Sequence, residues 1–61
     1  MKYSAGDSVK LKNDQNFGNE NIEKGTKGVV QLVLNLSQSY NIRFEGSANN
    51  HVVHETDLED V

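Results

Sequence analysis

Apolar residues occupy every second position in several short segments of this chain, a spacing typical of half-buried β-strands. No segment shows a helical period, and only residues 56–58 (Thr56-Asp57-Leu58) are expected to form one tight helical turn. The pattern therefore predicts an all-β fold, either a small sandwich or a small barrel. The predicted strands span residues 8–12, 28–36, 40–45, 51–54 and 59–61.

The longest predicted strand runs from about Gly28 to Leu36 and has apolar residues on both faces. The side chains expected on the core face are Val30, Leu32, Leu34 and Leu36. The other face carries Val29 and Val33, as expected for a strand that bends across a small barrel. An exposed apolar strip of this kind also allows a second copy of the chain to pair there.

One long connection, residues 13–27, separates the first two predicted strands and is rich in asparagine. Asparagine favours turns because its side chain bonds nearby backbone and tolerates the left-handed region. A loop of ~15 residues in so small a domain is usually functional or disordered. Phe17 and Ile22 are its apolar residues, and we expect them to tether it to the core.

The order of the motifs resembles the small bacterial and phage Src-homology-3-like barrels across nearly the whole chain. It is also similar to KOW modules and to the small accessory protein of photosystem I that has this fold. The resemblance implies one five-stranded barrel over residues 1–61, with the long loop at 13–27 and a short 3-10 turn near 56–58. The motifs are Gly6-Asp7-Ser8-Val9, Lys24-Gly25-Thr26-Lys27-Gly28-Val29-Val30, Tyr40-Asn41-Ile42-Arg43-Phe44-Glu45-Gly46 and Glu55-Thr56-Asp57-Leu58-Glu59.

These motifs have structural reasons. Gly25 and Gly28 flank a turn that needs positive φ or a close backbone approach. Asp57 is expected to cap the helical turn, and Leu58 to fill one end of the barrel. Tyr40 and Phe44 are expected inside.

The composition narrows the classes of protein further. The chain has 61 residues, no cysteine, no proline, no tryptophan and a net charge of −3. Without cysteine there is neither a disulfide framework nor a cysteine zinc site. The absence of tryptophan argues against a proline-rich peptide groove. No apolar run approaches the ~18 residues of a membrane span, so no membrane insertion and a cytoplasmic location are expected.

Candidate chemistry is sparse. His51 and His54 are three residues apart on a predicted strand, which places them on opposite faces and unable to chelate one metal ion. One of them is expected at the strand edge beside Glu55. No nucleophile elbow and no phosphate loop are present. We therefore expect no enzyme activity, no metal and no cofactor.

Three functional hypotheses remain. The leading one is a non-catalytic protein-interaction module, an accessory or regulatory subunit that binds a protein partner. The second is weak nucleic-acid binding of the KOW type, and the third is docking onto a photosynthetic redox complex, as the resemblance implies. The partner-binding candidates are Phe17, Asn19, Glu20, Ile22, Ser47, Asn49 and His51, and the phosphate-contacting candidates are Lys10, Lys12, Lys27 and Arg43.

Overall fold

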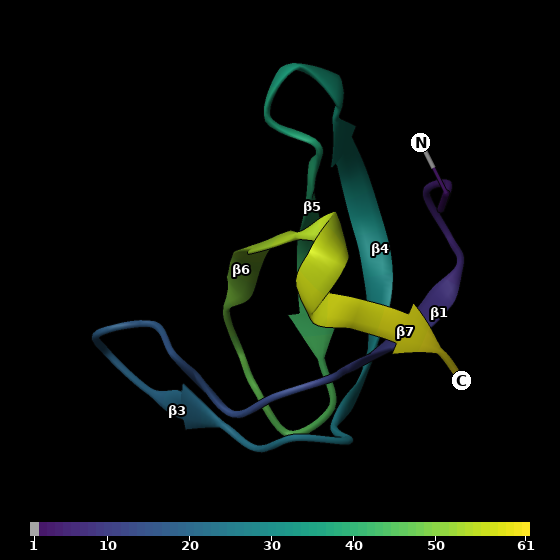
Figure 1. Ribbon diagram of the computed structural model, residues 1–61. Coiled ribbons are helices and arrows are strands. Elements are labelled where there is room, and N and C mark those ends of the chain that lie inside the picture. Colours follow the sequence, from purple (N-terminus) through teal and green to yellow (C-terminus); the bar gives the residue numbers. More distant parts are fainter. Residues whose placement is uncertain (1) are drawn as a thin grey trace.

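The computed structural model describes residues 2–61 and is all-β (Figure 1). Its elements are β1 (Ser8–Leu11), β2 (Gln15–Asn16), β3 (Asn21–Ile22), β4 (Lys27–Leu34), β5 (Ser39–Phe44), β6 (Asn50–His54) and β7 (Leu58–Asp60), with 3-10 turns η1 (Asn35–Ser37) and η2 (Glu55–Asp57). The all-β prediction is confirmed. The predicted 3-10 turn is also present, one residue earlier than expected, and the last strand begins correspondingly at Leu58.

Five strands form one antiparallel sheet in the order β6-β5-β4-β1-β7, and β2 and β3 form a separate hairpin inside the long connection. The two edge strands, β6 and β7, are joined by η2, but no strand pairing between them is present in residues 2–61. Closure into a barrel therefore stays a prediction. Both 3-10 turns are short, and within the described residues no helix has the length and apolar character needed to cross a membrane.

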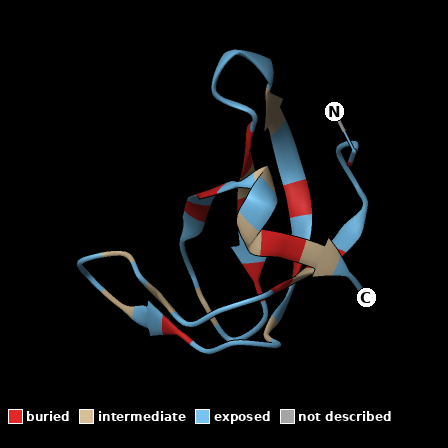
Figure 2. Ribbon diagram, in the orientation of Figure 1, coloured by how far each residue is buried: buried red, intermediate tan, exposed pale blue. Residues whose placement is uncertain are grey.

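The core lies on one face of the sheet, and its buried positions follow the period of two (Figure 2). Tyr40, Ile42 and Phe44 of β5 are at most 1% exposed, as their alternation predicts. Leu58 is also buried, as expected. The complete apolar core of the described residues is Tyr3, Val9, Leu11, Ile22, Val30, Tyr40, Ile42, Phe44, Val53 and Leu58.

The alternation in β4 breaks at a β-bulge. Val30 pairs with Ile42, but the next paired residue, Leu32, faces Asn41, so β4 has one extra residue at Gln31. An inserted residue shifts all following side chains to the opposite face. Leu32 is consequently 54% exposed, and Val33 packs against the core instead.

The expectation that Leu32, Leu34 and Leu36 face the core is therefore wrong. Leu34 is only half-buried, and β4 ends there. Leu36, predicted as the last strand residue, lies in η1 and is fully exposed. Of the two residues predicted for the outer apolar strip, Val29 is exposed but Val33 packs against the core. Leu32 is exposed in its place.

The predicted roles of two glycines are confirmed. Gly25 has a φ of 86° in the turn before β4, where L side chains are strained. Gly28 permits β4 to approach β5, because a Cβ atom there would lie 2.6 Å from Ile42 Cγ2 and 2.9 Å from Phe44 Cδ1.

A network of hydrogen bonds ties the N-terminal segment to β5 and η2. The Tyr40 hydroxyl donates to Glu55 Oε1 (2.5 Å) and accepts the Tyr3 main-chain N–H (3.0 Å). The Lys2 N–H donates to the same Glu55 oxygen (2.8 Å). The bond from Tyr40 is the main reason that the pKa of Glu55 lies below its ordinary value of 4.5. The buried phenol is thus satisfied by two segments that are distant in sequence.

We expect Gly28→Ala to destabilise the protein by about 1–3 kcal/mol, because the added methyl group has no room between Ile42 and Phe44. Chemical denaturation measures the free energy of unfolding. The matched control is Lys27→Ala, an exposed neighbour in β4, which should change it by no more than about 0.5 kcal/mol. Equal effects for both substitutions would contradict the close approach of β4 and β5.

Candidate functional site

The long connection is ordered around the β2–β3 hairpin. The Phe17 N–H donates to the Glu20 carbonyl (2.9 Å), which closes the turn. The Asn16 side chain accepts the Gly18 N–H (2.7 Å), and Gly18 has a φ of 91°. Asparagine and glycine supply this geometry at little cost, so the local sequence specifies the turn.

Aromatic packing attaches this hairpin to the main sheet. The Phe17 ring stacks on the His51 ring of β6 with a centroid distance of 4.1 Å and an interplanar angle of 17°. The Phe44 ring lies near both of them. Its centroid is 6.3 Å from that of Phe17 and 6.5 Å from that of His51. Ile22 of β3 is buried and belongs to the core. The predicted tethering of the loop by Phe17 and Ile22 is therefore confirmed.

A polar cluster reinforces the same contact. Glu20 Oε1 lies 2.5 Å from His51 Nε2 and also accepts a hydrogen bond from Ser47 Oγ, at 2.5 Å. Ser47 Oγ in turn accepts the Asn49 N–H (3.2 Å). The Ser47 hydrogen bond first, and the His51 bond second, hold the pKa of the Glu20 carboxyl below 4.5. The carboxylate thus joins the β2–β3 turn to the middle of the β5–β6 turn, at Ser47, and to β6, at His51.

The structure brings together most of the predicted partner-binding residues. Phe17, Glu20, Ser47 and His51 are linked by direct contacts, although they are far apart in sequence. Their polar atoms bond mainly to one another, so their evident role is to hold the hairpin. Asn19 is exposed at the turn. That these residues bind a partner stays a prediction.

The two histidines lie on opposite faces of β6, as predicted: His51 is buried and His54 is exposed. The prediction that Asp57 caps the helical turn is wrong, because the side chain of His54 accepts the Thr56 N–H (3.2 Å) and caps η2. A histidine that directly precedes the turn can reach this orphan N–H, whereas Asp57 is the last residue of the turn.

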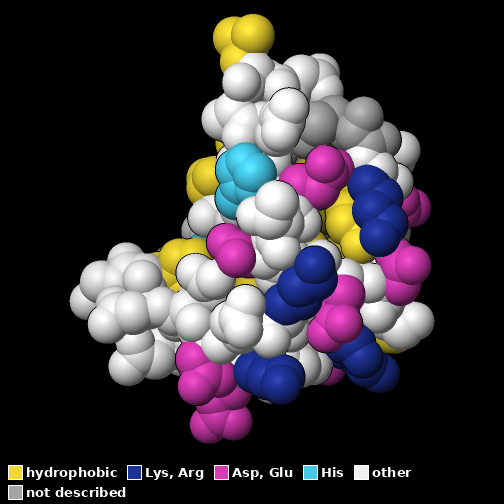
Figure 3. Space-filling view, viewed as in Figure 1, with side chains coloured by type: hydrophobic (Ala, Val, Ile, Leu, Met, Phe, Trp, Pro, Cys, Tyr) yellow, Lys and Arg dark blue, Asp and Glu magenta, His cyan; other side chains and the backbone are white. Residues whose placement is uncertain are grey.

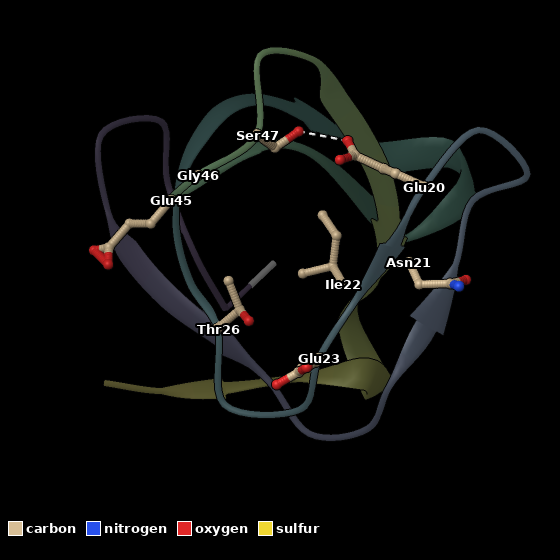
Figure 4. Close-up of a pocket in the computed structure, with 8 residues that line it drawn as sticks. All are labelled: Glu20, Asn21, Ile22, Glu23, Thr26, Glu45, Gly46 and Ser47. Carbon is tan, nitrogen blue, oxygen red and sulfur yellow. Dashed lines mark hydrogen bonds between the residues drawn. The ribbon is translucent and has the colours of Figure 1, made fainter.

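A hollow of about 250 Å³ lies between β3 and the β5–β6 turn (Figure 4). Figure 4 shows Ile22 at its centre, with the Glu20 carboxylate turned toward Ser47 and Glu45 turned outward. Glu23 also lines it, which gives the hollow an acidic rim. Across residues 2–61, no group of three or more potential metal ligands is close enough to hold an ion.

The candidate phosphate contacts do not form a purely basic face. Lys10, Lys27 and Arg43 point outward from β1, β4 and β5, and Lys10 lies directly opposite Lys27. Glu59 of β7 lies opposite Lys10 on its other side. Figure 3 shows Lys and Arg side chains interspersed with Asp and Glu. Lys12 is exposed beyond the end of β1. Nucleic-acid binding stays a prediction.

The exposed apolar strip expected from the sequence includes Val29, but three other exposed aliphatic residues, Leu32, Leu36 and Val52, are not predicted to be exposed. Leu32 and Val52 are each more than half exposed, and Leu36 is fully exposed. Alternation alone places Leu36 inside a continuous strand, which hides it. The signal available in the sequence is the absence of any charged residue between Lys27 and Arg43, in a chain that is 25% charged.

No family model, curated protein or solved structure matches this chain. The resemblance to Src-homology-3-like barrels therefore stays a prediction.

We expect Glu20→Gln to reduce the amount by which the free energy of unfolding falls as the pH is lowered. The pKa of Glu20 is lower in the folded chain than in the unfolded chain, so its contribution is present above pH 4.5 and is lost as pH falls through the folded value. Denaturation between about pH 6 and pH 3 measures this. The control is Glu23→Gln, because the Glu23 side chain makes no hydrogen bond within residues 2–61. A steeper or unchanged profile for Glu20→Gln would refute the assignment.

Proposed function

We propose that this chain is a non-catalytic protein-interaction module, an accessory or regulatory subunit that contacts its partner through the end of the β4–β5 hairpin. The observation that carries the proposal is Leu36, a fully exposed leucine at the tip of an uncharged projecting segment. Figure 1 shows this tip extending beyond the rest of the chain, and Figure 3 shows hydrophobic atoms at the same end.

The tip has a defined shape rather than being a free loop. Gln38 adopts a left-handed conformation (φ 53°), which is strained for a non-glycine residue. Its N–H donates to the Asn35 carbonyl (3.3 Å), and its own carbonyl accepts the Glu55 N–H (2.9 Å). The Ser39 hydroxyl donates to the Ser37 carbonyl (3.1 Å). A fixed tip loses little conformational entropy on binding.

The chemistry of the tip suits an apolar pocket on another protein. A shallow hollow of about 470 Å³ at the tip has mostly apolar walls and is lined by Val33, Leu34, Asn35, Leu36 and Ser37. Burial of a fully exposed leucine side chain in an apolar pocket of the partner stabilises the complex by about 1.5–3 kcal/mol. Because no charge has to be desolvated, the gain is not offset by a buried ion. The partner is therefore a protein whose surface has an apolar pocket that can bury an aliphatic side chain.

We expect Leu36→Asp to reduce partner capture at least tenfold without lowering the thermal stability, since the side chain makes no core contact. The measurement is photo-crosslinking from position 35, next to the substituted residue, in a lysate of the source cells, followed by identification of the adducts. Val61→Asp is the matched control, because Val61 is a second exposed aliphatic residue away from the tip. Identical adducts from wild type and Leu36→Asp would exclude the tip as the contact surface.

A further inference from the structure

Strand β6 leaves one side of its main chain unpaired. The Glu55 N–H bonds to the Gln38 carbonyl (2.9 Å) in the same register that pairs β6 with β5. Because main-chain groups alternate sides along an antiparallel strand, His51 and Val53 direct theirs toward β5. The residues whose N–H and C=O groups point to the open edge are Asn50, Val52 and His54. No hydrogen bond reaches those groups within residues 2–61.

The two edges of the sheet are protected differently. Strand β7 is three residues long and carries Glu59 and Asp60, and Asp60 pairs with Lys2 at 3.7 Å. Short length and charge are two devices that prevent strand addition. Strand β6 has five residues with no Lys, Arg, Asp, Glu or Pro, and its register with β5 contains no bulge. The β6 edge is therefore the unprotected one.

We propose that β6 pairs antiparallel with β6 of a second copy of this chain, about a two-fold axis at Val52. Val52 then faces Val52 of the second copy, and Asn50 faces His54 of the second copy. The outward N–H and C=O groups of the two valines bond to each other, as in any hydrogen-bonded antiparallel pair. A two-fold interface needs one patch that complements itself, and this register meets that condition with no like charges opposed.

The outer face of the sheet supports the same register. Leu32, Asn41 and Val52 are aligned across β4, β5 and β6. When Val52 lies beside Val52 of the second copy, the row of one chain continues into the row of the other. The two rows then form a single line of side chains across the sheets of both copies. The two valines, each 56% exposed in the single chain, then cover one another. A strand from an unrelated protein would supply the hydrogen bonds but not this symmetric continuation, which is why a second copy is the favoured occupant.

The first test is self-association of the purified chain, measured by sedimentation across a range of concentrations. Val52→Lys, which opposes two lysines, should weaken the dimer at least tenfold, and so should Val52→Glu. An equimolar mixture of the two variants should restore it, because Lys then faces Glu. Val29→Lys is the matched control, because Val29 is exposed on the same face but lies in the interior strand β4, and it should leave the dimer intact.

The second test fixes the register by disulfide formation, because the chain has no cysteine of its own. Val52→Cys should form an intermolecular disulfide on mild oxidation. Asn50→Cys alone should not, since the two copies of position 50 are about 14 Å apart in the proposed register. Asn50→Cys mixed with His54→Cys should cross-link.

A chain that stays monomeric at all concentrations would overturn the proposal. So would a dimer abolished by Val29→Lys, which would indicate face-to-face packing, or cross-linking of Asn50→Cys alone. These results are separable from the proposed function, because they concern the purified chain. If both proposals hold, Leu36→Asp leaves the dimer intact and Val52→Lys leaves the adducts formed at the β4–β5 tip unchanged.

Discussion

One extra residue in β4 determines how this chain divides its apolar side chains between core and surface. The bulge at Gln31 lies between Val30, which is buried against Ile42, and Leu32, which is exposed opposite Asn41. Without it, Leu32 would lie in the core and Val33 would face solvent. The bulge therefore supplies the core with one smaller side chain and leaves a larger aliphatic one outside. The exposed row on the outer face is a direct consequence.

So small a chain also has to recruit its long connection into the core. A domain of about 60 residues buries only ~60% of the surface of its unfolded chain, so each additional buried group matters. The β2–β3 hairpin contributes Ile22 to the core and stacks Phe17 on His51. The Glu20 carboxylate then satisfies His51, which would otherwise be a buried polar group without a partner. The cluster that the sequence suggests as a binding site is thus used mainly to complete the fold.

The fold class is predictable from the sequence because alternation is a local property. Val9, Leu11, Tyr40, Ile42 and Phe44 are buried where the period of two places them. A bulge adds a residue without leaving a local mark, so alternation assigns the positions after Val30 to the wrong face. The sequence analysis groups Glu20, Ser47 and His51 among the partner-binding candidates, but it does not show which atoms join them. Glu20 and His51 are 31 residues apart, and only the folded register brings them together.

The distribution of charge gives the two ends of the sheet different properties. Lys10 and Glu59 face each other where β1 meets β7, and Lys2 pairs with Asp60, so that edge is hydrated and partly self-neutralised. At the other end, β6, the part of β4 after Lys27 and the part of β5 before Arg43 carry no Lys, Arg, Asp or Glu. A charge at an edge is the simplest barrier to strand addition. A sheet that is charged at only one of its two edges can therefore accept a further strand only at the other edge. Association through β6 would use the uncharged edge and would leave the charged β7 edge in water.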